Sequence, residues 1–460
     1  MKNFHYSFFF SNYKIKRVLI VTLVLCLSLY GAAQNPFITA IYTADPSAHV
    51  WKDGRLYVYP SHDIDPAKGC DLMDRYHVYS TDDMAHWRDE GEILNAGQVP
   101  WGRKEGGFMW APDCAYKNGT YYFYFPHPSD TKWNASWKIG VATSKQPASN
   151  FTPAGYIEGV GGNAMIDPCV FIDTDGKAYF YYGGGRVCQG GRLKESMTEL
   201  DGAMQDMTGL VDFHEAAWVF KRKDIYYLTY ADNNPKQNRL RYATSASPLG
   251  PWLYRGVYMD TTGCDTHHGS VVEFKGKWYA FYHNKSISNT GNGNLRSICV
   301  DLLNFNDDGT IQMVKQTITG PAAVGRKPAS VKKQTRYEAE TASIGGDATI
   351  SGVPAASGGK CITNLGATDA YLQFEHINGA RGGRFTIDIC YANNSYAKLK
   401  LRVNDVDYSY LNAIPPNQTG NFGGHILFTV RLNPGKRNVI RLTGGKGNVS
   451  MDYIALTPVE

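Results

Sequence analysis

The sequence of 460 residues contains nine cysteines but lacks any Cys-x-x-Cys pair. Zinc ribbons and thioredoxin-type redox sites use such pairs, so neither class has support. The sequence also lacks a strong charge imbalance, since 47 Lys+Arg stand against 42 Asp+Glu and four of the basic residues lie in the first 33 positions. The remainder is close to neutral, which offers no field to nucleic acid or to an anionic membrane and suits a neutral polysaccharide.

Helical periodicity is missing as well, because no stretch has the spacing of a convincing amphipathic helix. What the chain has instead is 13% aromatic residues, including 31 Tyr, together with 48 Gly. Aromatic side chains favour strands and Gly serves the turns between them. The composition therefore predicts an all-β protein, and the length predicts two or three domains.

The longest apolar run, residues 18–30, is too short to span a membrane comfortably. Basic residues precede it and the small residues 31–33 follow it, which is the pattern of a secretory signal. We predict a signal peptide over residues 1–33 and an exported protein, periplasmic or extracellular, with no membrane attachment after its removal. A signal anchor is the alternative.

Eight cysteines lie beyond this segment. An oxidising compartment permits disulfides, but an even count alone does not establish a pairing. Cys114 and Cys169 lie inside strand-like runs, and for these two we predict buried free thiols.

The strongest signal is an internal repeat. Each copy has an apolar strand, a tight turn of the Lys-Asp-Gly kind and an alternating aromatic strand, as in DPSAHVWKDG followed by RLYVYPSHD. Asp-Gly and Asn-Gly supply the positive φ that tight hairpins need. The turns recur at positions 54, 119, 176, 224 and 276. One hairpin for each repeat of this length is typical of propeller blades, so we predict a five-bladed β-propeller over residues 34–320.

Polar residues occupy the first position of most copies, just before the inner hairpin. The first strand of each blade lines the central channel, so these residues are expected to converge at one mouth. A single carboxylate there would more often cap a turn, but three carboxylates at equivalent positions favour a functional site. The first residues of the five copies are Asp45, Trp110, Asp167, Glu215 and His267.

These motifs resemble glycoside hydrolase family 43, whose members are mostly arabinofuranosidases, xylosidases and arabinanases. The resemblance covers nearly all of the first 320 residues after the signal. Ala217 departs from it, because the family often has Pro near the catalytic acid. The motifs that carry the resemblance are Ala44-Asp45-Pro46, Trp110-Ala111-Pro112-Asp113, Ile166-Asp167-Pro168, the Glu215 segment with Tyr226-Tyr227, and His268-Gly269-Ser270.

The resemblance implies Asp45 as general base, Glu215 as general acid and Asp167 as the group that orients Glu215 and raises its pKa. An inverting glycosidase needs one carboxylic acid for the leaving oxygen and one carboxylate for water, about 6.5–9.5 Å apart. An ionised neighbour keeps the acid protonated near neutral pH.

Further site residues follow from the same resemblance. Arg296 matches an arginine that contacts the sugar, and His268 matches a histidine near a channel cation, usually calcium. Trp110 and Phe108 are expected at the substrate. For the aromatic loop cluster a sugar-stacking platform and simple loop packing are equally supported; its members are Trp101, Phe108, Trp133 and Trp137.

A Pro-, Gly- and Lys-rich stretch, residues 321–334, is predicted as a linker. Residues 335–460 then have the size of one β-sandwich of jelly-roll type. The stretches 337–340 (YEAE) and 451–454 (MDYI) resemble carbohydrate-binding module families 6 and 35. In those families the acidic residues of the two motifs bind a structural calcium, which carboxylate oxygens suit; here they are Glu338, Glu340 and Asp452.

Tyr391 and Asn448 match positions of a sugar site at the loop end of such modules, and Phe422 is the nearest substitute for a missing Trp. A purely structural sandwich is the alternative. Removal of residues 335–460 is expected to spare activity on small substrates and to weaken polysaccharide binding.

The sequence thus predicts a monomeric, inverting glycosidase of the arabinofuranosidase or β-xylosidase type, with calcium and no organic cofactor. Alternatives are a non-catalytic sugar-binding propeller and a galactan- or xylan-directed glycosidase of the same fold. A retaining fructan hydrolase is disfavoured, because the Trp-Met-Asn-Asp-Pro string of that group does not surround Asp45.

Overall fold

The structure is a computed structural model. It describes residues 34–66, 70–161, 164–234, 238–288, 290–325, 334–366, 369–416 and 422–459. The predicted signal peptide, most of the predicted linker and the side chain of Trp133 lie outside the described residues. Within the described ranges the chain is almost entirely β, with one four-residue helix, α1 (Trp133–Ser136), and 3₁₀ turns at Ala96–Gln98, Ala339–Thr341 and Ser357–Gly359. The all-β prediction is confirmed.

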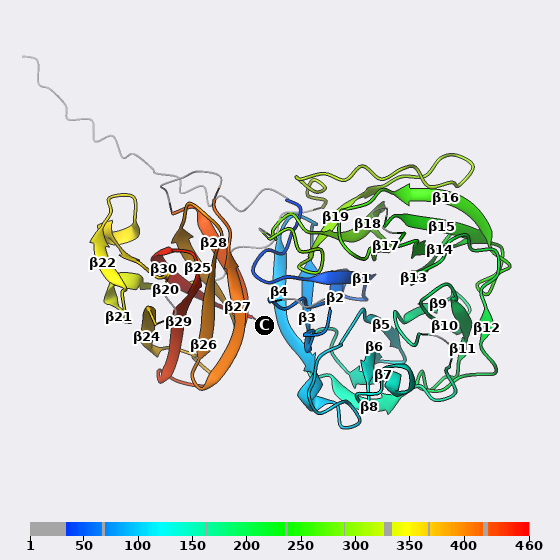
Figure 1. The fold of residues 1–460 in the computed structure, drawn as a ribbon, viewed down its shortest axis with the longest axis horizontal. Helices are drawn as coiled ribbons and strands as arrows, with labels where there is room; N and C mark the ends of the chain where they lie inside the picture. The colour runs from blue at the N-terminus through cyan, green and yellow to red at the C-terminus, as the bar shows by residue number, and fades with distance from the viewer. Residues whose placement is uncertain are drawn as a thin grey trace, which may run out of the picture.

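In the N-terminal unit (residues 34–325) the described residues form five antiparallel sheets, each with its strands in chain order. Figure 1 shows these sheets arranged around a common centre. The first sheet contains β1 (Ala44–Val50), β2 (Leu56–Ser61), β3 (Arg75–Thr81) and β4 (Trp87–Asn95). The second contains β5 (Asp113–Lys117), β6 (Thr120–Pro128), β7 (Trp137–Ser144) and β8 (Thr152–Tyr156).

The third sheet contains β9 (Cys169–Ile172), β10 (Ala178–Tyr182), β11 (Gln189–Leu193) and β12 (Gln205–Asp206). The fourth contains β13 (Glu215–Arg222), β14 (Ile225–Ala231), β15 (Leu240–Ser245) and β16 (Leu253–Met259). The fifth contains β17 (Ser270–Phe274), β18 (Lys277–Asn284) and β19 (Ser297–Leu303). The first strands of the sheets touch in a circuit, since β1 contacts β5 and β17, β9 contacts β5 and β13, and β13 contacts β17.

The repeated hairpins have two kinds of connection. Strand register leaves two residues in the turns at 118–119, 223–224 and 275–276, as the sequence predicts. The other two connections, 51–55 and 173–177, have five residues. In these longer loops Gly54 and Gly176 have φ values of +76° and +81°, and each donates its N–H to the carbonyl three residues earlier. The Asp-Gly pairs at these two places therefore close a longer loop and not a two-residue turn.

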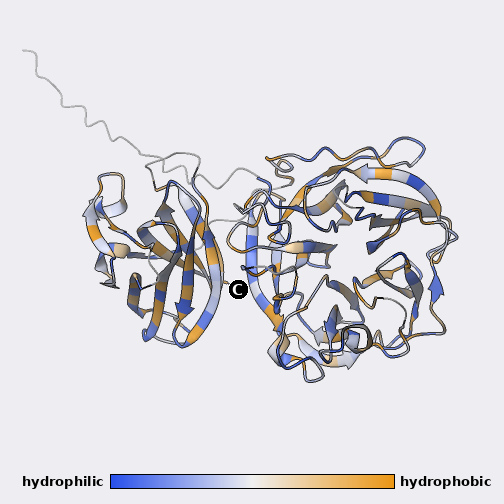
Figure 2. Ribbon diagram, viewed as in Figure 1, coloured by the Kyte–Doolittle hydropathy of each residue, from blue (hydrophilic) through white to orange (hydrophobic). Residues whose placement is uncertain are grey.

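The C-terminal unit (residues 334–459) consists of two antiparallel sheets in its described part. One runs in the order β22 (Thr349–Gly352), β23 (Lys360–Thr363), β30 (Ser450–Pro458), β25 (Gly383–Ala392) and β28 (Gly424–Leu432), with β20 (Thr335–Glu338) also on β30. The other runs β21 (Ser343–Gly345), β24 (Tyr371–Ile377), β29 (Asn438–Lys446), β26 (Ala397–Val403) and β27 (Val406–Ala413). Hydrophobic and hydrophilic residues alternate along these strands (Figure 2), and the inward set forms one apolar core.

The two units pack against each other. Figure 1 shows β28 beside β4, where Asp89 accepts the backbone N–H of Thr429 at 2.7 Å. Ala40 and Ile41 of the N-terminal unit belong to the apolar core of the C-terminal unit. The backbone N–H of Asn412, on β27, donates to the carbonyl of Ala40 at 2.8 Å. The C-terminal unit therefore covers the segment that leads into β1.

The eight cysteines of the described residues are all free thiols, and seven of them are buried. Cys114 and Cys169 are among the buried thiols, as predicted. No helix within the described ranges is long and apolar enough to cross a membrane.

Candidate active site

Asp45 lies at the start of β1, in a left-handed backbone conformation with φ of +52°. The pairing of β1 with β2 shifts register between Ala44 and Ser47, so the aspartate sits in a bulge. Ser61 donates to one carboxylate oxygen at 2.6 Å, and Arg296 Nη1 donates to the other at 2.9 Å. Both oxygens of Asp45 are thus held by named donors.

Electrostatics keep Asp45 ionised. Burial opposes the charge, but the charges of Arg296, His268 and His283 outweigh it and lower the pKa of Asp45 to about 2. Arg296 is the permanent charge among them, because burial lowers the pKa of both histidines. Asp45 is therefore a carboxylate at any pH above about 3.

Asp167 lies just before β9 with a φ of +54°, and its Oδ2 accepts the backbone N–H of Ala216 at 2.9 Å. His268 Nδ1 is 3.7 Å from Asp167 and 3.9 Å from Asp45, so the imidazole lies between the two aspartates. Burial, with the charges of Glu215 and Asp45 close by, raises the pKa of Asp167 well above its ordinary value. Of the two aspartates, Asp167 is thus the one whose pKa is raised by burial and by the charges of its neighbours.

Glu215 is the first residue of β13, and a register shift between Glu215 and Trp218 makes a second bulge. Asn233 donates to Oε1 of Glu215, and His214 Nδ1 lies 3.4 Å from Oε2. The hydrogen bond to Glu215 raises the pKa of His214. Ala217, where the resembled family often has Pro, is buried, and the Glu215 side chain remains 15% exposed.

Arg296 is buried and holds two aspartates, Asp45 and Asp63, by hydrogen bonds. Its Nε and Nη2 each donate to Asp63 at 2.9 Å in a bidentate pair, and its Nη1 also donates to Thr266 at 2.9 Å. The backbone N–H of Arg296 donates to Asp63 as well, at 2.8 Å. Arg296 thus joins Asp63 to Asp45 in one rigid clamp.

Several of these partners were missed by sequence reasoning. Ser61, Asp63, Asn233 and His283 all lie at or just beyond the end of the aromatic second strand of a repeat. That end returns to the channel mouth, because the second strand is antiparallel to the first. Polar residues at the end of the aromatic strand were the available signal.

Phe108 and Trp110 belong to a half-buried aromatic cluster. The ring centroids of Phe108 and Trp110 are 6.2 Å apart, those of Trp110 and Trp137 are 4.4 Å apart, and the Arg103 guanidinium lies over Phe108 at 4.9 Å. Tyr76 donates to the Trp110 carbonyl at 2.7 Å. Burial is the main cause of the raised pKa of Tyr76, and the charges of Asp45 and Asp167 add to it. The Trp110 backbone therefore adjoins the carboxylates.

His267, at the first position of the fifth repeat, is bonded to neighbouring backbone and side-chain groups, and within the described residues none of its hydrogen bonds reaches the three carboxyl groups. Its ring is fully buried with Nδ1 3.1 Å from the Asn238 carbonyl, and the backbone N–H of His267 donates to Oδ1 of Asn233 at 2.9 Å. In the described part of the chain no three His, Cys, Asp or Glu side chains form a group arranged to hold a metal ion.

The three acidic residues of the C-terminal unit nevertheless lie together. Ser357 donates its hydroxyl to Glu338 at 3.2 Å and its N–H to Asp452 at 2.9 Å. One buried oxygen of Glu338 and one of Glu340 have no hydrogen-bond partner. Burial, with Glu338 and Glu340 nearby, raises the pKa of Asp452. Calcium takes carboxylate oxygens of this kind, but the described side chains are not arranged as a three-ligand metal site, and Arg336 pairs with Glu338 at 3.1 Å.

Tyr391, Phe422 and Asn448 lie at one end of the C-terminal unit, around the paired ends of β25, β28 and β30. The Tyr391 ring is buried in the core, and its hydroxyl donates to the Ile414 carbonyl at 2.7 Å. Tyr391 is 3% exposed and Gly424 lies against its ring, so a sugar contact at Tyr391 stays a prediction that needs a change in this packing. Phe422 is half-buried and Asn448 is exposed.

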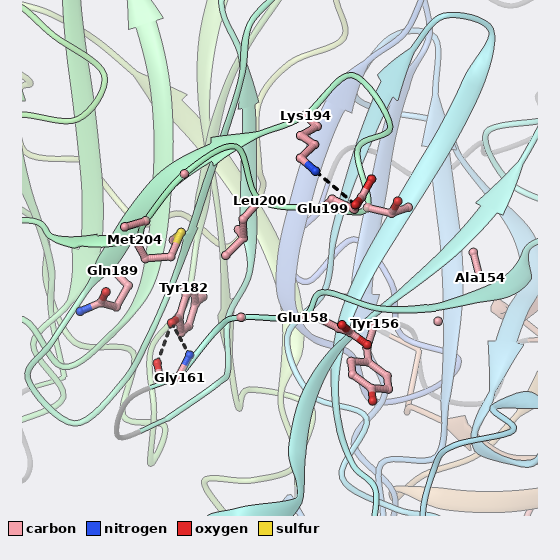
Figure 3. Close-up of a pocket in the computed structure, with 15 residues that line it drawn as sticks. Ala154, Tyr156, Glu158, Gly161, Tyr182, Gln189, Lys194, Glu199, Leu200 and Met204 are labelled. Atoms are coloured by element: carbon pink, nitrogen blue, oxygen red, sulfur yellow. Dashed lines mark hydrogen bonds and ion pairs between the residues drawn. The ribbon is translucent and has the colours of Figure 1, made fainter.

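A groove of about 1120 Å³ lies elsewhere, between the second and third sheets of the N-terminal unit. Figure 3 shows the ion pair of Lys194 with Glu199, and Tyr182 bonded to the backbone of Gly161. None of the predicted site residues lines this groove.

Several known proteins are similar to this chain. Residues 33–311 match the family model described as glycosyl hydrolases family 43. Xylosidase/arabinosidase 43A of Humicola insolens is 34% identical over 333 residues, which cover 60% of this chain and 98% of the relative. The solved structure of a β-xylosidase/α-arabinofuranosidase from a compost microbial metagenome, in complex with xylotriose, is 36% identical, covers 62% of this chain and 97% of its own, and has a TM-score of 0.56.

A longer match is the arabinoxylan arabinofuranohydrolase of Bacillus subtilis in complex with cellotetraose. It is 25% identical, covers 92% of this chain and 97% of its own, and has a TM-score of 0.54. Coverage of this extent includes most of the C-terminal unit. The family model spans more than half of the chain, and the carboxylates Asp45, Asp167 and Glu215 all lie within it: the chain belongs to glycoside hydrolase family 43 and has the propeller fold of that family.

Proposed function

We propose that this protein is an inverting glycoside hydrolase that removes arabinofuranose or xylose from plant cell-wall polysaccharides or oligosaccharides. The observation that carries the proposal is the arrangement of three carboxyl groups, the buried Asp45 and Asp167 and the half-buried Glu215. Asp45 is held ionised by Arg296, while Asp167, beside Glu215, has a raised pKa. Hydrolysis with inversion requires one carboxylate to activate water and a second carboxyl group to protonate the leaving oxygen. Asp45 supplies the carboxylate, and Glu215, beside Asp167, supplies the second carboxyl group.

In this mechanism Asp45 accepts a proton from the attacking water and Glu215 donates one to the leaving oxygen. The Arg296 and Ser61 hydrogen bonds fix the Asp45 carboxylate, so its orientation toward water is set before substrate binds. Asn233 fixes the Glu215 carboxyl on the facing side. Asp167, whose Oδ2 accepts the N–H of Ala216 directly after Glu215, orients the segment that carries the acid.

The substrate class rests on the relatives. Xylosidase and arabinosidase are the activities named for the Humicola relative, and the metagenomic structure contains xylotriose. Pentose-containing oligosaccharides carry no charge, which agrees with the near-neutral balance of the chain beyond residue 33. The half-buried rings of Phe108 and Trp110 supply apolar faces for such a sugar.

We extend the proposal to the architecture. The circuit of contacts among β1, β5, β9, β13 and β17 supports a five-bladed propeller, and the two packed sheets of the C-terminal unit support a jelly-roll carbohydrate-binding module. Glu338, Glu340 and Asp452 would hold a structural calcium, with the unpartnered oxygens as ligands. The signal-like segment supports export to the periplasm or the cell exterior, and the enzyme is expected to act as a monomer.

The test is hydrolysis of p-nitrophenyl α-L-arabinofuranoside, p-nitrophenyl β-D-xyloside and xylo-oligosaccharides by the purified chain beside Glu215→Gln. Because protonation assists a poor leaving group most, Glu215→Gln should lower kcat on oligosaccharides by about 10²–10⁴-fold and spare the nitrophenyl substrates more. Proton NMR of the first-formed sugar should show the inverted anomer. Equal kcat in both proteins, or a retained anomer, would contradict the proposal.

A further inference from the structure

The C-terminal unit reaches the clamp that holds the catalytic aspartate. Tyr396 of that unit accepts a hydrogen bond from the Tyr42 hydroxyl at 2.7 Å, because its own hydroxyl proton goes to Asn412 at 2.6 Å. Asn412 in turn donates its backbone N–H to Ala40. The segment Ala40–Tyr42, three residues before Asp45, is thereby fixed from the C-terminal unit.

The same segment is bound on its other side to the arginine of the site. The N–H of Thr43 donates to the carbonyl of Arg296 at 2.9 Å, and the Thr43 hydroxyl accepts the N–H of Ile298. Buried Tyr42, Ile287 and Leu295 form a small apolar cluster that the C-terminal unit completes with Tyr396 and Ile414. Leu295 directly precedes Arg296, so this packing sets the course of the chain at the guanidinium.

A second contact reaches the other half of the clamp. Lys398, on β26, is buried and forms an ion pair with Asp65. Asp65 follows by two residues the Asp63 carboxylate that binds Arg296 in bidentate fashion. Both loops that meet at Arg296 are therefore held from the C-terminal unit, one through Tyr396 and one through Lys398.

We propose that Tyr396 and Lys398 are positioning residues of the active site, which act through Tyr42, Leu295 and Asp65 to hold the Asp63–Arg296–Asp45 clamp. The C-terminal unit is on this account a structural part of the catalytic centre in addition to any sugar-binding role. The kinetic consequence rests on the hydrolase function proposed above, whereas the structural consequence does not.

The test uses the full chain with Tyr396→Phe and Lys398→Met, singly and combined. Tyr410→Phe and Lys400→Met are matched controls. Lys400 lies on β26 with Lys398, and Tyr410 lies on β27 with Asn412, the hydrogen-bond partner of Tyr396. The Tyr410 residue is 49% exposed, and the Lys400 side chain is 40% exposed and pairs with Asp407 of the same unit. We expect the combined variant to lose about 10-fold or more in kcat, because small displacements of a catalytic group cost that much, while KM changes less than about 2-fold. Lys398→Arg should restore most of the loss.

A pH profile distinguishes positioning from general weakening. The groups that face Asp45 are Arg296, His268, His283, Asp167 and Ser61. Looser contact with Arg296 raises the pKa of Asp45, so the acidic limb of kcat/KM should move to higher pH in the combined variant and stay in place in the controls.

Hydrogen–deuterium exchange of peptides that span residues 37–44 and 290–298 gives a readout without turnover. Faster exchange there in the combined variant, with unchanged exchange in the controls, is expected. Exchange and kinetics equal to those of the controls would overturn the inference. If the parent chain hydrolyses none of the substrates while the exchange result holds, the hydrolase proposal fails and the positioning contact stands.

Discussion

Asp45, Asp167 and Ala216 share a backbone conformation that side chains rarely adopt, with φ between +52° and +66°. Such strain costs about 1–3 kcal/mol at each residue and persists only where the surroundings fix it. Here the surroundings are the hydrogen bonds of Ser61 and Arg296 to Asp45 and of Ala216 to Asp167. Other positive-φ residues lie elsewhere in the chain, but at these three the hydrogen bonds of the site hold the strained backbone in place.

The effect of the site on stability can be measured at Asp167. Its folded pKa lies well above the unfolded value, so its protonated form stabilises the fold below about pH 4, and that stability is lost as the pH rises through the folded pKa. At neutral pH the buried Asp167, near Glu215 and Asp45, therefore lowers the free energy of unfolding.

Asp167→Asn removes the charge and keeps an oxygen for the Ala216 N–H. We expect the variant to be more stable than the parent at pH 7 by about 1 kcal/mol, a gain common at functional sites, and the gain to disappear near pH 4. Thermal unfolding across this range measures it, and kcat/KM should fall at the same time. Lower stability at pH 7 would show that Asp167 is held by attractions the structure does not contain.

At the scale of strands and turns, the repeat predicted the hairpins well because their pattern is local. Alternating aromatic residues predict a strand, and Asp-Gly or Asn-Gly pairs predict the turn that precedes it. The repeat did not predict the bulges at Asp45 and Glu215, which arise from the register between two strands. Nor did it predict the Asp63–Arg296 pair, whose members are far apart in the chain and meet only after the ring of strands closes.

The turn at residues 118–119 allows a local test. Gly119 has a φ of +79° and open space where a Cβ would be, so Gly119→Ala meets no atom and costs only backbone strain, about 1 kcal/mol. Gly352→Ala, which also has open space but no positive φ, is the control and should change little. Urea unfolding of both variants measures the difference. Equal stabilities would mean that this turn is not limited by its backbone.

At the scale of the whole molecule, the boundary predicted near residue 334 is a boundary in sequence but not in packing. A proline- and lysine-rich stretch suggested two independent bodies, and activity without residues 335–460 followed from that view. Ile41 lies 1% exposed in the core of the C-terminal unit, and Thr429 is bonded to Asp89 across the interface. Contacts between distant segments of this kind leave no mark on local composition.

Calorimetry checks this joint packing. The full chain should unfold in one transition. Ile41→Ala empties a buried site, so it should lower the free energy of unfolding of both units together by about 2–5 kcal/mol. Ile350→Ala, at a side chain 51% exposed on the C-terminal unit, is the control and should leave the transition nearly unchanged. Two separate transitions, with only one moved by Ile41→Ala, would contradict a shared core.

The shared core also constrains how such enzymes can be recombined. A cut in the linker alone would separate the C-terminal unit from part of its own core. Here Ala40 and Ile41 belong to the apolar core of a unit whose own chain begins near residue 334. A transplanted C-terminal unit would therefore need a segment equivalent to Ala40–Ile41, which lies some 290 residues earlier in the chain.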